Sequence, residues 1–204
     1  MYTKHPLIMR STTTRPGSNN NNKGKLALCF LLYDTVEHAG VWESFLENHE
    51  DRCNIYSHPK MVTDRTPDWI KKAKISRPLK TGWCEESLVF AYLKMVKKAM
   101  EDPTNKYFAI VSGTCIPLHK FDTVYEKVFK YPQSRIYYLP KKESVVFNGE
   151  DLNPHYQWMI LNRKQAKDAL RLLDKNDERA QAFLKMMRAK YRFHAKHETW
   201  YSYC

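Results

Sequence analysis

The sequence lacks the short motifs that identify several common enzyme classes. It contains no G-x-S-x-G nucleophile turn, no Walker phosphate loop, no G-x-G-x-x-G fingerprint and no H-E-x-x-H zinc helix. An Asp-x-Asp pair, which would hold a divalent metal against a nucleotide diphosphate, is also missing. His194 and His197 lie three residues apart but have no evident third ligand, so we expect no metal site. Pattern rules alone therefore find no known catalytic signature.

Long apolar runs and paired cysteines are absent as well. No apolar run approaches the roughly 18 residues of a membrane span. Residues 1–24 are polar, lack the apolar stretch of a secretory signal, and are expected to form a disordered leader. The five cysteines include no C-x-x-C pair, which argues against a disulfide framework and a zinc site. Because there is also no N-glycosylation sequon, we expect a reducing, cytoplasmic setting.

Basic residues are abundant and give a net charge of +12. Such a balance favours phosphate-bearing ligands, nucleic acid or an anionic surface. Many of the basic side chains fall within residues 163–196, where a solvated helix surface is the simpler interpretation. Acidic residues interrupt the first half of this block, including Asp168, Asp174 and Asp177, and they weaken a nucleic-acid interpretation. Nucleic-acid binding therefore stays an alternative and not the leading hypothesis.

Apolar runs alternate with helical patterns along residues 25–204, which we interpret as one domain. Strands are predicted at 25–33, 53–57, 107–111, 135–139 and 157–161. Helices are predicted around 41–46 and at 86–101, 121–129, 164–173 and 178–191. This alternation predicts an α/β fold with a mostly parallel sheet flanked by helices.

The clearest candidate for a ligand site follows the strand at 107–111. Ser112, Gly113, Thr114 and Cys115 come directly after it, and open α/β sheets bind ligands outside the carboxyl ends of their strands. Simpler interpretations remain open. Ser112-Gly113 can be only a strand-ending turn, and Cys115 is more often a buried small residue than a nucleophile.

Similar alternatives apply to the aromatic and acidic candidates. Trp83 and Trp158 can be core aromatics. Glu85 and Glu86 begin a helix, whose positive dipole end favours carboxylates without any function.

Several segments, in the same order, resemble the core-2/I-branching β-1,6-N-acetylglucosaminyltransferases and their plant and viral relatives. The most specific matching motifs are Ser-Gly-Thr-Cys-Ile-Pro-Leu at 112–118 and Asp-Pro-Thr-Asn at 102–105. The resembling segments are residues 26–33, 42–45, 55–60, 83–89, 102–108, 111–118 and 156–158. The resemblance covers about residues 25–162.

The resemblance implies a GT-A-like fold and transfer of a sugar from a UDP-sugar, with GlcNAc or xylose expected. It implies a glycan or protein acceptor, inversion at the anomeric carbon, and no Asp-x-Asp metal or other cofactor. Family members neutralise the leaving diphosphate with basic side chains, which can stabilise the charge that develops there. Inversion by direct displacement needs one carboxylate to remove the acceptor proton.

Residue by residue, the resemblance implies a donor site. Leu32 and Tyr33 match the position that borders the nucleoside, and His58 falls where many relatives have the aspartate of a His-Val-Asp motif. The remaining donor-side matches are Trp83, Glu86 and Ser87 before the buried helix, and Ser112, Gly113 and Cys115 near the sugar and diphosphate. Gln157 and Trp158 match an acceptor-side segment.

The family's catalytic glutamate follows a Tyr-Ser-like segment, which here reads Trp200-Tyr-Ser-Tyr-Cys204. The resemblance therefore implies a base immediately beyond Cys204. The chain is expected to be either a fragment of a longer enzyme or a catalytically incomplete relative. A non-catalytic protein that binds a nucleotide sugar or a glycan remains an alternative to an enzyme.

Overall fold

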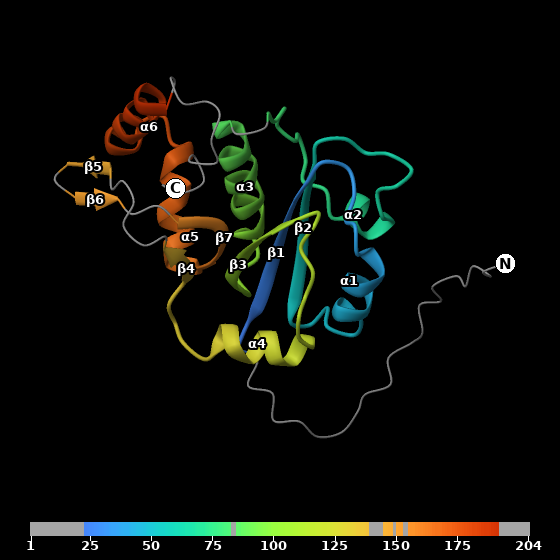
Figure 1. Ribbon diagram of the computed structural model, residues 1–204. Helices are drawn as coiled ribbons and strands as arrows, with labels where there is room; N and C mark the ends of the chain where they lie inside the picture. Colours follow the sequence, from blue (N-terminus) through green and yellow to red (C-terminus); the bar gives the residue numbers. More distant parts are fainter. Residues whose placement is uncertain (1–22, 83–84, 139–144, 149, 153–154, 192–204) are drawn as a thin grey trace.

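The computed structural model describes residues 23–82, 85–138, 145–148, 150–152 and 155–191. Figure 1 shows a central sheet with helices on both of its faces. The disorder predicted for residues 1–24 falls almost entirely outside the described ranges, as does the predicted site residue Trp83.

The main sheet has five strands in the order β2-β1-β3-β7-β4. Their bounds are β1 Lys25–Leu32, β2 Cys53–Pro59, β3 Asn105–Ser112, β4 Arg135–Tyr138 and β7 His155–Asn162. Strand β1 pairs in parallel with both β2 and β3. Strand β7 is antiparallel to β3 and to β4, so β4 runs in the same direction as β3. The sheet is therefore mostly parallel, as the sequence predicted.

Six α-helices connect or follow the described strands. They are α1 Ala39–Leu46, α2 Asp68–Lys72, α3 Glu86–Ala99, α4 Phe121–Phe129, α5 Arg163–Ala169 and α6 Glu178–Tyr191. A 3₁₀ turn at Leu170–Leu173 continues α5. The sequence analysis missed α2 and the two short paired strands β5 Val145–Phe147 and β6 Glu150–Leu152. These elements have five residues or fewer, too short to show a clear periodicity.

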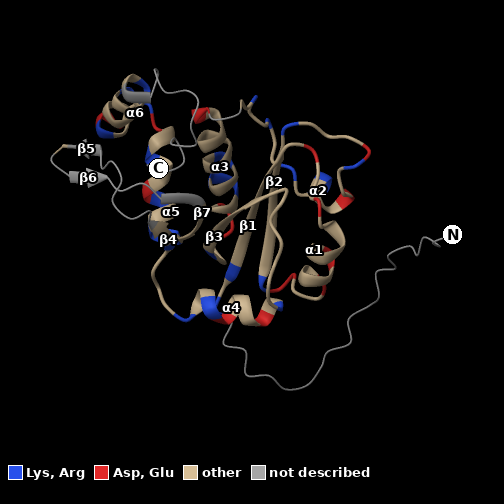
Figure 2. Ribbon diagram, in the orientation of Figure 1, with Lys and Arg blue, Asp and Glu red and all other residues tan. Residues whose placement is uncertain are grey.

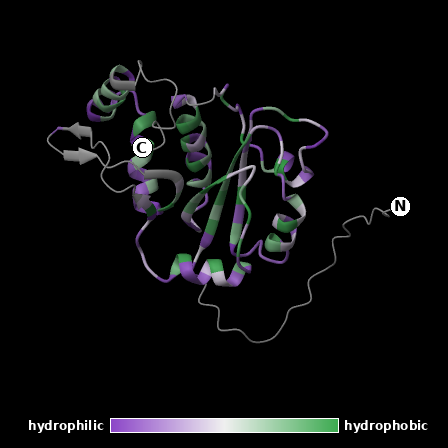
Figure 3. Ribbon diagram, viewed as in Figure 1, coloured by the Kyte–Doolittle hydropathy of each residue, from purple (hydrophilic) through white to green (hydrophobic). Residues whose placement is uncertain are grey.

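Alternation along β1 divides the core into two layers, one on each face of the sheet. Leu26, Leu28 and Phe30 belong to the layer that includes buried side chains of α1, α2 and α4. Ala27 and Cys29 face the other way and belong to the layer formed with α3 and α5. Both faces of β1 are thus buried, which explains its near-continuous apolar sequence. In Figure 3 the central strands are largely hydrophobic.

A buried polar network closes the end of the sheet where β1 and β3 begin. Asn105 is fully buried, and its side chain donates to the Ala99 carbonyl and to the Tyr56 hydroxyl. Asn54 donates to the side chains of both Asn105 and Asp102. The Asp-Pro-Thr-Asn motif at 102–105 therefore contributes to the packing of this end of the sheet. This end lies opposite the carboxyl ends of the parallel strands.

Arg163 extends the network from the start of α5. Its guanidinium donates hydrogen bonds to the backbone carbonyls of Met100, Asp102 and Asn105. These three carbonyls lie between the end of α3 and the start of β3. One side chain thus satisfies the Met100 carbonyl, which the end of α3 leaves without an intrahelical partner, and also bonds two carbonyls of the connection to β3.

Candidate functional site

A cavity of about 790 Å³ opens at the carboxyl ends of β1 and β3. Its floor includes Leu31 and Leu32 of β1 and Ile110 and Val111 of β3. The loops after these strands, the loop after β2, the start of α3 and Trp158 of β7 complete the wall. This is the edge of an open α/β sheet where ligand sites are expected.

Close backbone contact joins the loops that follow β1 and β3. The Glu37 amide donates to the Gly113 carbonyl at 2.9 Å. A Cβ placed on Gly113 would lie only 2.7 Å from the Thr35 carbonyl oxygen, so a side chain at position 113 would force the two loops apart. Glycine is the residue that permits this approach.

The loop after β1 is also fastened to the loop after β2. The Thr35 hydroxyl donates to the Arg65 carbonyl at 2.8 Å, and the Thr66 hydroxyl donates to the Asp34 carbonyl at 2.7 Å. The amides of Lys60 and Met61 donate to the carbonyls of Leu32 and Tyr33. These hydrogen bonds hold the two loops of the cavity wall in a defined shape, although neither loop is a helix or a strand.

Two exposed aromatic side chains line the cavity. Tyr33 is 64% exposed and Trp158 is 48% exposed, so neither is a core residue. The Lys60 ammonium lies 5.6 Å from the centre of the Tyr33 ring. Large exposed aromatic faces in a concave site are suited to stacking against a planar ligand group.

Charged side chains of both signs line the same wall. Lys60 and Arg65 supply positive charge, whereas Asp34 and Glu37 supply negative charge. Arg65 is 3.8 Å from the Asp34 carboxylate, and its side chain is 73% exposed. The pair is therefore loose and solvent-screened, which leaves the guanidinium accessible to an anionic ligand.

Six residues assigned from the sequence line this cavity: Leu32, Tyr33, Ser112, Gly113, Thr114 and Trp158. The Ser112 hydroxyl lies within hydrogen-bond distance of the Thr114 hydroxyl, at 3.2 Å. Lys60, Arg65, Asp34 and Glu37 were not assigned from the sequence. The available signal was their position in the segments that follow the predicted strands 25–33 and 53–57, since such segments share one edge of a parallel sheet.

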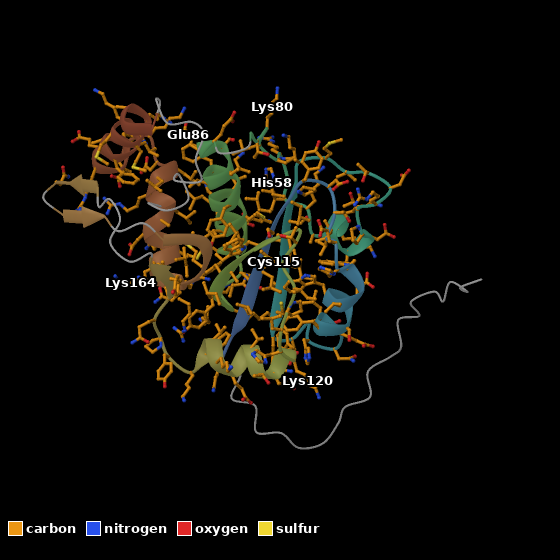
Figure 4. All side chains as sticks on the ribbon, in the orientation of Figure 1. His58, Lys80, Glu86, Cys115, Lys120 and Lys164 are labelled. Carbon is orange, nitrogen blue, oxygen red and sulfur yellow. The ribbon has the colours of Figure 1, made fainter. Side chains whose placement is uncertain are left out.

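His58, labelled in Figure 4, is fully buried and does not line the cavity. Its Nε2 accepts a hydrogen bond from the Leu79 amide at 2.9 Å, and its Nδ1 has no hydrogen-bond partner in the described structure. Burial lowers the pKa of His58, and the nearby Lys94 and Lys74 lower it further. Within the resembling segment 55–60, Lys60 is the residue that lines the cavity.

Glu86 and Ser87 begin α3 but do not line the cavity. Arg188 of α6 holds the Glu86 carboxylate with two hydrogen bonds, of 2.8 and 3.0 Å. The Ser87 hydroxyl accepts from the Gly82 amide and donates to Glu85. Both side chains organise the start of the helix beside the cavity.

Cys115 also lies outside the cavity lining. Cys115 is half-buried, packs against the core and lies 3.2 Å from the Ser112 hydroxyl. Its carbonyl accepts from the Trp42 indole. Gln157 belongs to β7 beside Trp158, and only its backbone falls within the described structure.

The basic block beginning at residue 163 carries interleaved charges of both signs along α5 and α6 (Figure 2). Arg171 pairs with Asp177, and Lys164 lies 3.7 Å from Asp168. Arg163 and Arg188 are engaged in the contacts given above. This distribution supports a solvated, internally paired surface rather than a continuous cationic stripe.

Two searches over the described residues returned nothing. No helix among them is long and apolar enough for a membrane crossing. No group of three or more His, Cys, Asp or Glu side chains among them is arranged to hold a metal ion.

The sequence comparison decides the family. The family model for the core-2/I-branching enzyme matches residues 26–144, more than half of the chain. The protein belongs to the core-2/I-branching enzyme family. The match begins in β1 and includes β2, β3 and β4, so it contains most of the cavity floor and the loops after β1, β2 and β3.

One curated relative is the glycosyltransferase BC10 of Oryza sativa subsp. japonica. It is 25% identical over 158 residues, which cover 70% of this chain and 39% of BC10. This chain thus spans well under half of the length of that relative.

A solved structure with a similar arrangement is 4-diphosphocytidyl-2C-methyl-D-erythritol synthase from Anaerococcus prevotii. It covers 82% of this chain and 86% of its own, with 14% identity and a TM-score of 0.40.

Proposed function

We propose that the cavity at the ends of β1 and β3 binds the UDP-sugar donor of an inverting glycosyltransferase. The sugar would be a hexosyl or pentosyl group, with GlcNAc or xylose the first candidates. The acceptor would be a hydroxyl of a glycan or a protein. Membership of the core-2/I-branching family and similarity to BC10 support glycosyl transfer as the reaction class.

The composition of the cavity wall carries this proposal. Tyr33 and Trp158 offer aromatic faces for a nucleobase, and Lys60 and Arg65 offer positive charge for a diphosphate. A volume of about 790 Å³ falls within the range of cavities that enclose small-molecule ligands. Aromatic faces beside cations suit a nucleoside diphosphate better than a neutral glycan alone.

The proposed reaction is a single displacement. The acceptor oxygen forms a bond to the anomeric carbon while the bond from that carbon to the diphosphate oxygen breaks. The leaving UDP keeps the bonding electron pair, and a carboxylate takes the acceptor proton. Lys60 and Arg65 would stabilise the charge that develops on the leaving group, which is the task given to a metal ion in other enzymes. We therefore propose that no metal is required.

Calorimetric titration with UDP-, GDP- and CMP-sugars, in the presence of a chelator, tests the donor site. We expect one UDP-sugar to bind in the micromolar range, corresponding to about −8 kcal/mol. Binding that needs added Mg²⁺ or Mn²⁺ would contradict metal independence. If no nucleotide sugar binds under either condition, the donor-site assignment is wrong.

A further inference from the structure

The charged pair between Glu86 and Arg188 joins two helices that are far apart in the sequence. Glu86 is the first residue of α3, and Arg188 lies in α6, 102 residues later. Arg188 Nε and Nη2 donate to separate carboxylate oxygens, so the guanidinium and the carboxylate meet along two parallel bonds. Figure 4 shows Glu86 at the end of α3 that lies nearest α6. Two-bond contacts of this kind fix orientation as well as distance.

The helix start that this pair holds is also a wall of the cavity. Thr81, Gly82 and Leu88 line the cavity immediately before and after Glu86. Gly82 is tied to α3 because its amide donates to the Ser87 hydroxyl at 3.0 Å. The Leu88 amide donates to the Glu85 carbonyl, which places Leu88 in the first turn. A shift of this turn would therefore move three residues of the cavity wall.

Helix α6 provides a firm support for the contact. Leu184 and Met187 are buried on α6, one of them next to Arg188. Glu86 lies in the first turn of α3, at the positive end of the helix dipole, where a negative side chain is stabilising. The Glu86 carboxylate is already occupied on both oxygens and does not line the cavity.

We propose that Glu86 and Arg188 are positioning residues for the donor site. They tie α6 to the first turn of α3 and thereby set the position of Thr81, Gly82 and Leu88. This inference rests on the proposed function for the identity of the ligand. In this inference Glu86 fixes the first turn of α3 and does not contact the donor itself.

Charge-swap variants separate positioning from direct contact. In Glu86→Ala and in Arg188→Ala, we expect the affinity for UDP to fall about two- to fivefold by calorimetry, the range expected when a partly exposed pair is lost. The double variant E86R/R188E should recover most of the loss, apart from the mild penalty of a cation at a helix N-terminus. Lys185→Ala, on the exposed side of the same helix, is the matched control and should bind as wild type.

The opposite pattern would overturn the proposal. If Glu86 contacts the donor directly, Arg188→Ala binds UDP normally and the double variant binds as poorly as Glu86→Ala. Arg188→Lys adds a graded test, because an ammonium cannot reproduce both parallel bonds. It should bind UDP with an affinity between those of wild type and Arg188→Ala.

Amide hydrogen exchange gives a readout that needs no ligand. Arg188→Ala should speed exchange at Gly82 and Leu88 while leaving the β1 amides protected, and E86R/R188E should restore protection. Unchanged exchange in Arg188→Ala would refute the inference even if no nucleotide binds. Failure of the wild-type protein to bind UDP would refute the proposed function alone.

Discussion

Gly113 and Thr35 meet where the loops after β3 and β1 form part of the cavity wall. The Thr35 carbonyl oxygen would lie 2.7 Å from a Cβ on Gly113, a distance that side chains do not tolerate. Both residues line the cavity, so the shape of the proposed donor site depends on the absence of one methyl group.

Gly113→Ala should therefore damage the site more than the fold. We expect a loss of about 1–3 kcal/mol in the free energy of unfolding, from overpacking against backbone, together with weaker UDP binding. Urea unfolding and calorimetry measure the two effects. Gly40→Ala is the matched control, because its Cβ would meet nothing within 4 Å and it lies in α1. That variant should be slightly more stable and should bind normally.

Lys60→Met and Arg65→Met should weaken binding of UDP about five- to tenfold each, because each removes one charge facing the diphosphate. Uridine, which lacks the diphosphate, should bind the wild type and both variants with similar affinity. Lys120→Met, at an exposed lysine outside this cavity, serves as the control. Equal losses for UDP and uridine would show that these residues shape the wall and do not contact phosphate.

Asn105→Ala should destabilise the protein without altering donor affinity at temperatures where it stays folded. The substitution leaves the buried Ala99 carbonyl without its side-chain donor and deprives Asn54 of an acceptor. We expect a loss of about 1–3 kcal/mol in chemical unfolding, because the variant loses several hydrogen bonds of about 0.5–1.5 kcal/mol each. Asn176→Ala, at an exposed position, should change stability little. A stable Asn105→Ala variant would show that the network adds nothing to the fold.

His58 makes stability depend on pH below its ordinary pKa. Burial lowers the pKa of His58 in the folded state, whereas the unfolded chain titrates near the ordinary value of about 6.5. Above this value both states hold a neutral imidazole and the full stability is present. As the pH falls below it, the unfolded state takes up a proton that the folded state resists, so the free energy of unfolding decreases.

The variant His58→Gln isolates this contribution. Its side-chain oxygen can accept from the Leu79 amide as Nε2 does, but it does not titrate. Between pH 5 and 6.5 we expect its unfolding free energy to fall less steeply than that of the wild type. Parallel pH profiles would show that His58 is not responsible.

The sequence was most informative where burial determines residue type. The continuous apolar run of β1 follows from burial on both faces of the sheet, and the broad apolar arc of α3 follows from packing of this helix on one of those faces. Both elements were predicted. The edge of the sheet at which the cavity opens was also predictable, since Ser112 and Gly113 follow a buried strand. For β7 the apolar pattern predicted a strand but could not give its direction, because strand direction depends on how the connecting segments return the chain.

The contacts that shape the site were less accessible to sequence reasoning. Arg188 reaches Glu86 across 102 residues, and an ion pair between exposed residues has no local signature. Lys60 and Arg65 resemble any surface basic residues until the loops after β1 and β2 are placed side by side. His58 matched a family segment, yet its side chain is buried beside Leu79, a contact formed only once the chain folds back.

The central place of β1 has a consequence for the order in which the protein folds. Leu28 pairs with Ile55 in β2 and with Ala109 in β3, so the two neighbours of β1 become available at very different chain lengths. Closing the shorter loop costs less entropy, and the β1-α1-β2 unit should therefore form ahead of the β1–β3 pairing during synthesis. Until β3 arrives, one edge of β1 remains unpaired and able to associate with other strands. The strand that organises the finished sheet is thus also the segment most in need of protection while the chain is being made.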